Sequence, residues 1–69
     1  MIRQGSEVSW KWGSSTASGT VQEVHHDKVT RQSKGESISR NGSDDNPAYV
    51  IEQDDGTTVL KLKSELQED

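Results

Sequence analysis

The sequence predicts a small all-β protein: a closed or nearly closed barrel of five to six short antiparallel strands, ending in a helical or 3₁₀ turn. Three observations lead to this prediction. Apolar and polar residues alternate over short runs, as they do in half-buried strands. Turn-forming residues separate these runs. Closing the sheet would also remove the edges that a short flat sheet exposes.

The composition indicates one marginally stable domain that covers residues 1–69. Only 26% of the residues are apolar, and the net charge is −4. A chain of this length buries a small core. Because it contains no cysteine, neither a disulfide framework nor a thiolate metal site supports that core.

The charge is unevenly distributed. Residues 1–40 carry six basic and four acidic side chains, and residues 41–69 carry two and eight, which gives +2 and −6. A binder of nucleic-acid backbone needs a concentrated basic surface, so the net charge of −4 disfavours that class. The sequence has no apolar run long enough for a signal peptide or a membrane span, so we expect a cytoplasmic protein without membrane contact.

The first strand is predicted over residues 7–12, where Val8, Trp10 and Trp12 alternate with polar residues. Residues 13–19 are small and polar and are predicted to form an exposed loop. The second strand follows in residues 19–24.

Simple alternation cannot bury both valines of this second strand, because Val21 and Val24 are three residues apart. A β-bulge near Gln22-Glu23 would reconcile them.

A hairpin is predicted over residues 29–40, with a two-residue turn at Lys34-Gly35. This turn pairs Arg31 with Ile38. The side chains that share one face of the hairpin are then Val29, Arg31, Ile38 and Arg40. Because this face is only partly apolar, we expect the hairpin to project from the body, with its arginines at the edge of a thin apolar contact.

The last hairpin is predicted over residues 48–62, around a two-residue turn at Asp55-Gly56. In this register Tyr49 pairs with Leu62. One face would carry Tyr49, Ile51, Leu60 and Leu62, and the other Val50, Glu52, Val59 and Lys61. On the second face, Glu52 and Lys61 would form a diagonal charge pair.

Two flanking segments complete the prediction. Residues 41–47 are dense in turn formers, and Pro47 places the start of the strand at or just after it. After the strand, Ser64 is predicted to cap a single helical or 3₁₀ turn, which docks Leu66 on the barrel.

Several segments resemble a known family. They are Gly5, Val8-Ser9-Trp10, Gly19-Thr20-Val21, Arg40-Asn41-Gly42-Ser43, residues 47–52 (PAYVIE), Asp55-Gly56, Val59-Leu60-Lys61-Leu62 and Ser64-Glu65-Leu66. The chain thereby resembles the hypervirulence-associated protein Tudor-domain family of small bacterial and fungal proteins, over a core of about residues 5–66. The resemblance implies an SH3-like barrel of the Tudor type and no catalytic residue. Asn46 departs from the acidic residue usual before the proline, which argues against a metal-binding acidic loop.

The aromatic residues Trp10, Trp12 and Tyr49 are the first candidate binding residues. Tudor barrels often use an aromatic cage to hold a methylated cation, and the alternative is that these side chains are core. The leading hypothesis is a groove lined by Trp12, Tyr49 and the loop at residues 13–18. In this groove a peptide or protein segment would bind, with Arg31 and Arg40 as charged contacts.

The alternative hypothesis is a nucleic-acid-associated domain that uses the basic hairpin at residues 28–40. Its basic side chains are Arg31, Lys34 and Arg40, which Lys28 and His26 could extend. No aromatic residue is interleaved with them, so the stacking platform of single-strand binders is missing. The other explanation is a solvated hairpin balanced by nearby acidic residues.

Catalysis, metal binding and cofactors are not expected. Adjacent strand residues point to opposite faces, so His25 and His26 cannot ligate one ion without a bend. The aspartates at 44–45 and 54–55 occupy predicted turns, where turn geometry accounts for them. We therefore expect a non-catalytic, monomeric interaction module. The third hypothesis is a small enzyme that is active only as a homo-oligomer.

Overall fold

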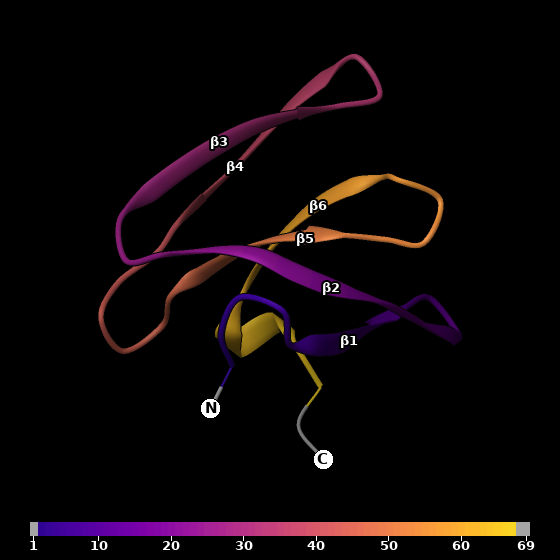
Figure 1. Cartoon of the computed structure of the whole chain (residues 1–69), viewed down its shortest axis with the longest axis horizontal. Coiled ribbons are helices and arrows are strands. Elements are labelled where there is room, and N and C mark those ends of the chain that lie inside the picture. The colour runs from indigo at the N-terminus through magenta and orange to yellow at the C-terminus, as the bar shows by residue number, and fades with distance from the viewer. Residues whose placement is uncertain (1, 68–69) are drawn as a thin grey trace.

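The computed structural model describes residues 2–67. Its elements are β1 (Glu7–Trp12), β2 (Ser15–His25), β3 (Lys28–Ser33), β4 (Glu36–Asn41), β5 (Ala48–Glu52), β6 (Thr58–Leu62) and the 3₁₀ helix η1 (Lys63–Glu65). One antiparallel sheet has the order β1-β2-β5-β6, and β3 and β4 form a second. The strands curl into a half-barrel with the β3–β4 hairpin on one side and η1 on the other (Figure 1). This arrangement confirms the predicted all-β, SH3-like fold.

Strand β5 is the centre of the fold because it is buried on both faces. It lies between β2 and β6, and its residues 48–51 are all buried. The first apolar cluster contains Trp10, Val21, Tyr49, Ile51 and Leu66. The second cluster, on the other face, contains Val29, Ala48, Val50 and Leu60. The small core is therefore divided between the two faces of one strand.

The predicted register of the β5–β6 hairpin is wrong by one residue. Its loop has three residues, because the N–H of Gln53 donates to the carbonyl of Thr57 across 2.9 Å. Gly56 at the end of the loop has φ +87°, as in a type I turn that closes with a glycine bulge. Tyr49 therefore pairs with Lys61 rather than with Leu62.

This shift rearranges both faces of the hairpin. Leu60 pairs with Val50 and packs in the second cluster instead of beside Tyr49. Glu52 pairs with Thr58, which places it on the face opposite to Lys61. The predicted Glu52–Lys61 charge pair is therefore wrong.

The β3–β4 hairpin has the predicted register. Lys34 and Gly35 form the turn with φ values of +53° and +81°, the positive pair that a type I′ turn requires, and Arg31 pairs with Ile38. Val29 is only 4% exposed, because it packs in the second cluster, where the half-buried Ile38 lies against it. The hairpin thus projects above β5 and β6 in Figure 1 while apolar side chains hold its inner face.

The first strand is confirmed at Glu7–Trp12, but the predicted loop at residues 13–19 is wrong. Ser15 already pairs with Trp12, so Gly13 and Ser14 alone form the turn, with Gly13 at φ +59°. Residues 15–19 belong to β2, because strand pairing uses backbone groups and tolerates small polar side chains at an exposed end. The predicted bulge is confirmed, since the β2–β5 register shifts between Val21 and Glu23.

The C-terminal segment confirms the predicted 3₁₀ turn but not its cap. The N–H of Leu62 donates to the Glu65 carboxylate at 2.8 Å, so Glu65 caps the turn in place of Ser64. Leu66 docks as predicted and is 9% exposed. Within residues 2–67, no helix is long and apolar enough to cross a membrane.

Candidate binding site at the open edge of the half-barrel

The three aromatic side chains have very different exposures. Trp10 and Tyr49 are each 3% exposed and belong to the first apolar cluster, whereas Trp12 is 68% exposed. Trp10 and Trp12 share one side of β1, but Trp12 is the last residue of the strand and lies next to the β1–β2 turn. Two of the three predicted aromatic site residues are therefore core, and Trp12 faces the solvent.

A depression of about 310 Å³ surrounds Trp12. The end of β1 and the turn after it form one wall, and β6 together with Gln53, the residue before the β5–β6 loop, forms the other. The lining residues are Trp10, Lys11, Trp12, Gly13, Gln53, Val59 and Lys61. The Lys61 ammonium lies 5.8 Å from the centre of the Trp10 ring, within cation–π range. This lining contains two lysines and no carboxylate.

The depression adjoins a free backbone edge. β1 is an outer strand of its sheet, and the carbonyl of Ser9 points away from β2 to accept the N–H of Gln67 at 2.8 Å. Backbone groups of alternate residues point to the same side of an antiparallel strand, so Lys11 also presents its N–H and C=O outward. Within residues 2–67 no backbone group bonds to that side of Lys11.

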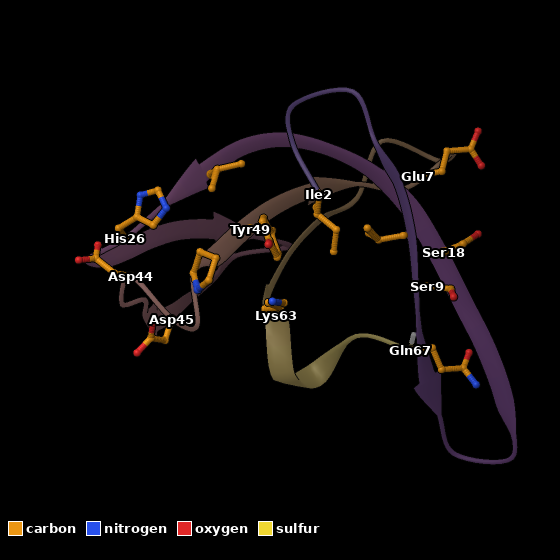
Figure 2. A pocket seen from close by; sticks show the side chains of 13 residues that line it. Ile2, Glu7, Ser9, Ser18, His26, Asp44, Asp45, Tyr49, Lys63 and Gln67 are labelled. Atoms are coloured by element: carbon orange, nitrogen blue, oxygen red, sulfur yellow. The ribbon is translucent and has the colours of Figure 1, made fainter. Parts of the chain in front are cut away.

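Tyr49 lines a different and wider depression, of about 820 Å³ (Figure 2). Its apolar lining comes from Ile2, Val8, Val24, Pro47 and Tyr49. The polar residues are His26, Asp44 and Asp45 at one end, Glu7, Ser9, Ser18 and Gln67 at the other, and Lys63 at η1. Burial raises the pKa of the Tyr49 phenol. Trp12 and Tyr49 thus line separate depressions, and the predicted groove is divided between them.

The two predicted arginine contacts are engaged within the protein. Arg31 forms an ion pair with Glu23 of β2 at 2.6 Å, and Arg40 forms one with Glu65 of η1 at 2.8 Å. Glu23 also contacts His25 at 2.8 Å. The hydrogen bond from His25 is the main cause that lowers the pKa of Glu23; Arg31 adds to it and burial opposes it. These arginines hold β3 and β4 to the rest of the fold.

Glu65 has several partners at once. Partial burial is the largest single effect and raises the pKa of its carboxyl group. The hydrogen bonds from Arg40 and from the Leu62 amide, together with the charges of Arg40 and Lys61, outweigh that effect and lower the pKa overall. Glu65 therefore stays ionised and links β4 to the start of η1.

The remaining candidates have local structural partners. Among residues 2–67, no three His, Cys, Asp or Glu side chains converge in a way that could hold a metal ion. Asp55 accepts the N–H of Thr57 at 2.9 Å, and this interaction with Thr57 is the main cause that lowers its pKa. Asp55 was predicted to serve the geometry of a turn, and this hydrogen bond within the β5–β6 loop does so.

Sequence reasoning missed the residues that surround Trp12, namely Lys11, Gln53, Val59 and Lys61. Lys61 and Val59 were assigned to the wrong face because the β5–β6 loop was taken as one residue too short. The signal that could have revealed them is the run Asp54-Asp55-Gly56, which also suits a three-residue loop with glycine last.

Comparison with known proteins identifies a family. The family model described as the Tudor domain of hypervirulence associated proteins matches residues 5–66. Neither a curated protein nor a solved structure matches the chain significantly.

Proposed function

The chain belongs to the hypervirulence-associated Tudor-domain family, and on that basis we propose that it is a non-catalytic binding module for an extended protein segment. The observation that carries this proposal is the 68% exposure of Trp12 beside the open edge of β1. Tryptophan is enriched among the residues that dominate binding energy, and this exposed indole adjoins both a depression and an unpaired strand edge.

The neighbourhood of Trp12 supports a protein ligand. An extended segment can add to a free strand edge through its backbone, while its side chains enter adjacent pockets. Lys11 offers such backbone groups at the edge of β1, and the depression of about 310 Å³ lies directly beside it. Affinity would come from backbone pairing and from covering the indole ring.

A cation cage is less well supported than a peptide site. A methylated ammonium group needs open aromatic faces and benefits from a nearby carboxylate. Here Lys61 already lies over the Trp10 ring, and no carboxylate lines the depression. A cationic ligand would therefore meet like charge.

The absence of catalysis is part of the proposal. A catalytic acid or base needs a shifted pKa in a pocket that can hold a substrate. Glu23 and Glu65 have lowered pKa values, and both form structural ion pairs. The pKa of Tyr49 is raised, and burial alone is the cause. The geometry also favours the peptide site over nucleic-acid binding by the β3–β4 hairpin, because Arg31 and Arg40 are paired with carboxylates.

A nitrogen-15 correlation spectrum tests the proposal. Extended peptides of about six residues, the usual strand length, are titrated into the wild type and into Trp12→Ala. We expect shifts at the Trp12 indole and at the amides of Lys11 and Gly13, and at least about tenfold weaker binding by the variant. Lys34→Ala, at the β3–β4 turn, changes a residue that does not line the depression; it is the matched control and should bind like the wild type.

Two results would contradict this function. In the first, every peptide leaves the Trp12 indole unshifted. In the second, the shifts gather on the β3–β4 hairpin and a short oligonucleotide binds there with steep salt dependence, which is the signature of phosphate contacts.

A further inference from the structure

The two lysines beside Trp12 differ from the two site arginines in their partners. Arg31 and Arg40 each form an ion pair with a carboxylate. Neither Lys11 nor Lys61 lies within salt-bridge distance of any carboxylate among residues 2–67. Both line the Trp12 depression, where no acidic side chain accompanies them. The site therefore has local positive charge in a chain whose net charge is −4.

This local charge selects the ligand by its sign. The net negative charge of the chain would repel an acidic segment, whereas the ammonium groups of Lys11 and Lys61 would attract it to this depression. A basic segment would meet the ammonium groups of Lys11 and Lys61 beside the indole. Charge complementarity between an interface and its ligand determines specificity and register more than affinity, so this arrangement would direct an acidic ligand to one position.

The backbone geometry selects an extended conformation. Lys11 presents its N–H and C=O outward. It lies two residues after Ser9, whose carbonyl accepts the N–H of Gln67. A strand added at this point would pair with Lys11 and pass Trp12. Because side chains alternate along a strand, apolar residues of the ligand would cover the indole, and the carboxylates between them would face the Lys11 ammonium group on the other side of β1. Lys61 lies over the Trp10 ring on the indole side and would attract the acidic segment through its charge, without direct contact with those carboxylates.

We propose that the ligand of the Trp12 site is an acidic, extended protein segment that adds to the open edge of β1, with its carboxylates against Lys11 and close to the charge of Lys61. This inference rests on the proposed function and specifies its ligand class. A protein segment is preferred to a nucleic acid because the site offers backbone groups for strand pairing. It also has a single exposed indole, whereas single-strand binders stack successive bases on several aromatic rings.

Three matched peptides of about six residues test the inference. The first alternates Glu with Val, the second replaces Glu by Gln, and the third replaces Glu by Lys. We expect the Glu peptide to bind the wild type about tenfold more tightly than the Gln peptide and the Lys peptide to bind weakest, since each exposed charge contact contributes a few-fold. Bound peptide should also slow amide hydrogen exchange at Lys11.

Charge reversal provides the second part of the test. Lys11→Glu changes an exposed side chain and should weaken binding of the Glu peptide by about fivefold while improving binding of the Lys peptide. Lys61→Gln removes the second charge and should weaken the Glu peptide by about twofold. Lys34→Glu makes the same reversal at a residue that does not line the depression and should change neither affinity.

The outcomes separate the inference from the function on which it rests. Equal affinity for the Glu and Gln peptides, with the indole still shifted, would overturn the acidic specificity and leave a binding module. Unchanged exchange at Lys11 in the bound state would overturn the strand addition. Tighter binding of an oligonucleotide than of the Glu peptide at Trp12 would overturn the protein ligand. No shift of the indole with any peptide would overturn the function and the inference together.

Discussion

The two hairpins β3–β4 and β5–β6 are alike in length but differ in what their side chains touch. In β3–β4 one side is polar and exposed, and the other carries Val29 and Ile38 toward the second apolar cluster. In β5 every residue from 48 to 51 is buried, because each face meets its own cluster. A strand with one buried face has its register set by alternation, whereas a strand buried on both faces depends on its turn.

The largest effect that would test this contrast comes from removing buried side chains. Ile51 is fully buried, so Ile51→Ala should lower the free energy of unfolding by about 3 kcal/mol. Ile38 is half-buried, and Ile38→Ala should lower it by about 1 kcal/mol. Urea denaturation followed by tryptophan fluorescence, in which the exposure of the buried Trp10 reports unfolding, measures both values. Equal losses would mean that β3–β4 contributes as much core as β5.

A second experiment tests how β3–β4 is attached. Arg40 of β4 pairs with Glu65, whose side chain also caps η1. Glu65→Gln should lower the free energy of unfolding by about 1 kcal/mol at neutral pH, because the pair is partly exposed to solvent. Glu36→Gln, at the exposed start of β4, is the control and should change it little.

The same pair gives a pH dependence. The pKa of Glu65 is lowered on folding, so its contribution is complete above the unfolded pKa of about 4.3. That contribution is lost as the pH falls through the lower folded value. Wild-type stability should therefore decrease more steeply than that of Glu65→Gln in acid. Parallel curves for the two proteins would contradict the assigned role of Glu65.

The smallest expected effect concerns the β5–β6 turn. Deleting Asp54 leaves Asp55-Gly56 as a two-residue loop between the same partners, Gln53 and Thr57. Both loop lengths can close this pair, so the free energy of unfolding should change by less than about 1 kcal/mol. Cross-strand nuclear Overhauser contacts between Ile51 and Val59 should persist, and Asp54→Asn serves as the length-preserving control. Loss of these contacts in the deletion variant would contradict the prediction that both loop lengths close this pair, and their absence in the wild type would contradict the three-residue loop.

Several features could be predicted from the residues because one physical signal determined each. Lys34-Gly35 with a polar face gave the β3–β4 register, and the spacing of Val21 and Val24 gave the β2 bulge. The β5–β6 register could not be derived, since Tyr49 to Ile51 are apolar on both faces and Asp55-Gly56 suits two loop lengths. Residues 15–19 were misassigned because they pair through the backbone.

The candidate site was only partly predictable for the same reason. Trp12 could be singled out as the aromatic residue beside a polar turn, but its exposure depends on how far the sheet curls. The partnership of Trp10 with Lys61 depends on the register of a distant hairpin. Likewise, the carboxylates that engage Arg31 and Arg40 come from β2 and η1, which no local pattern connects to them.

The pairing of β2 with β5 has a kinetic consequence. These strands meet only after the chain between them has formed a closed loop, and that loop contains the whole β3–β4 hairpin. A hairpin with local pairing can form in about 1–10 μs, whereas nonlocal β pairing is slow. Early formation of β3–β4 would bring His25 and Ala48 close together, so that β2 and β5 would pair across a shorter remaining loop. The projecting hairpin would then form first and speed the pairing of β5, the strand whose residues belong to both apolar clusters.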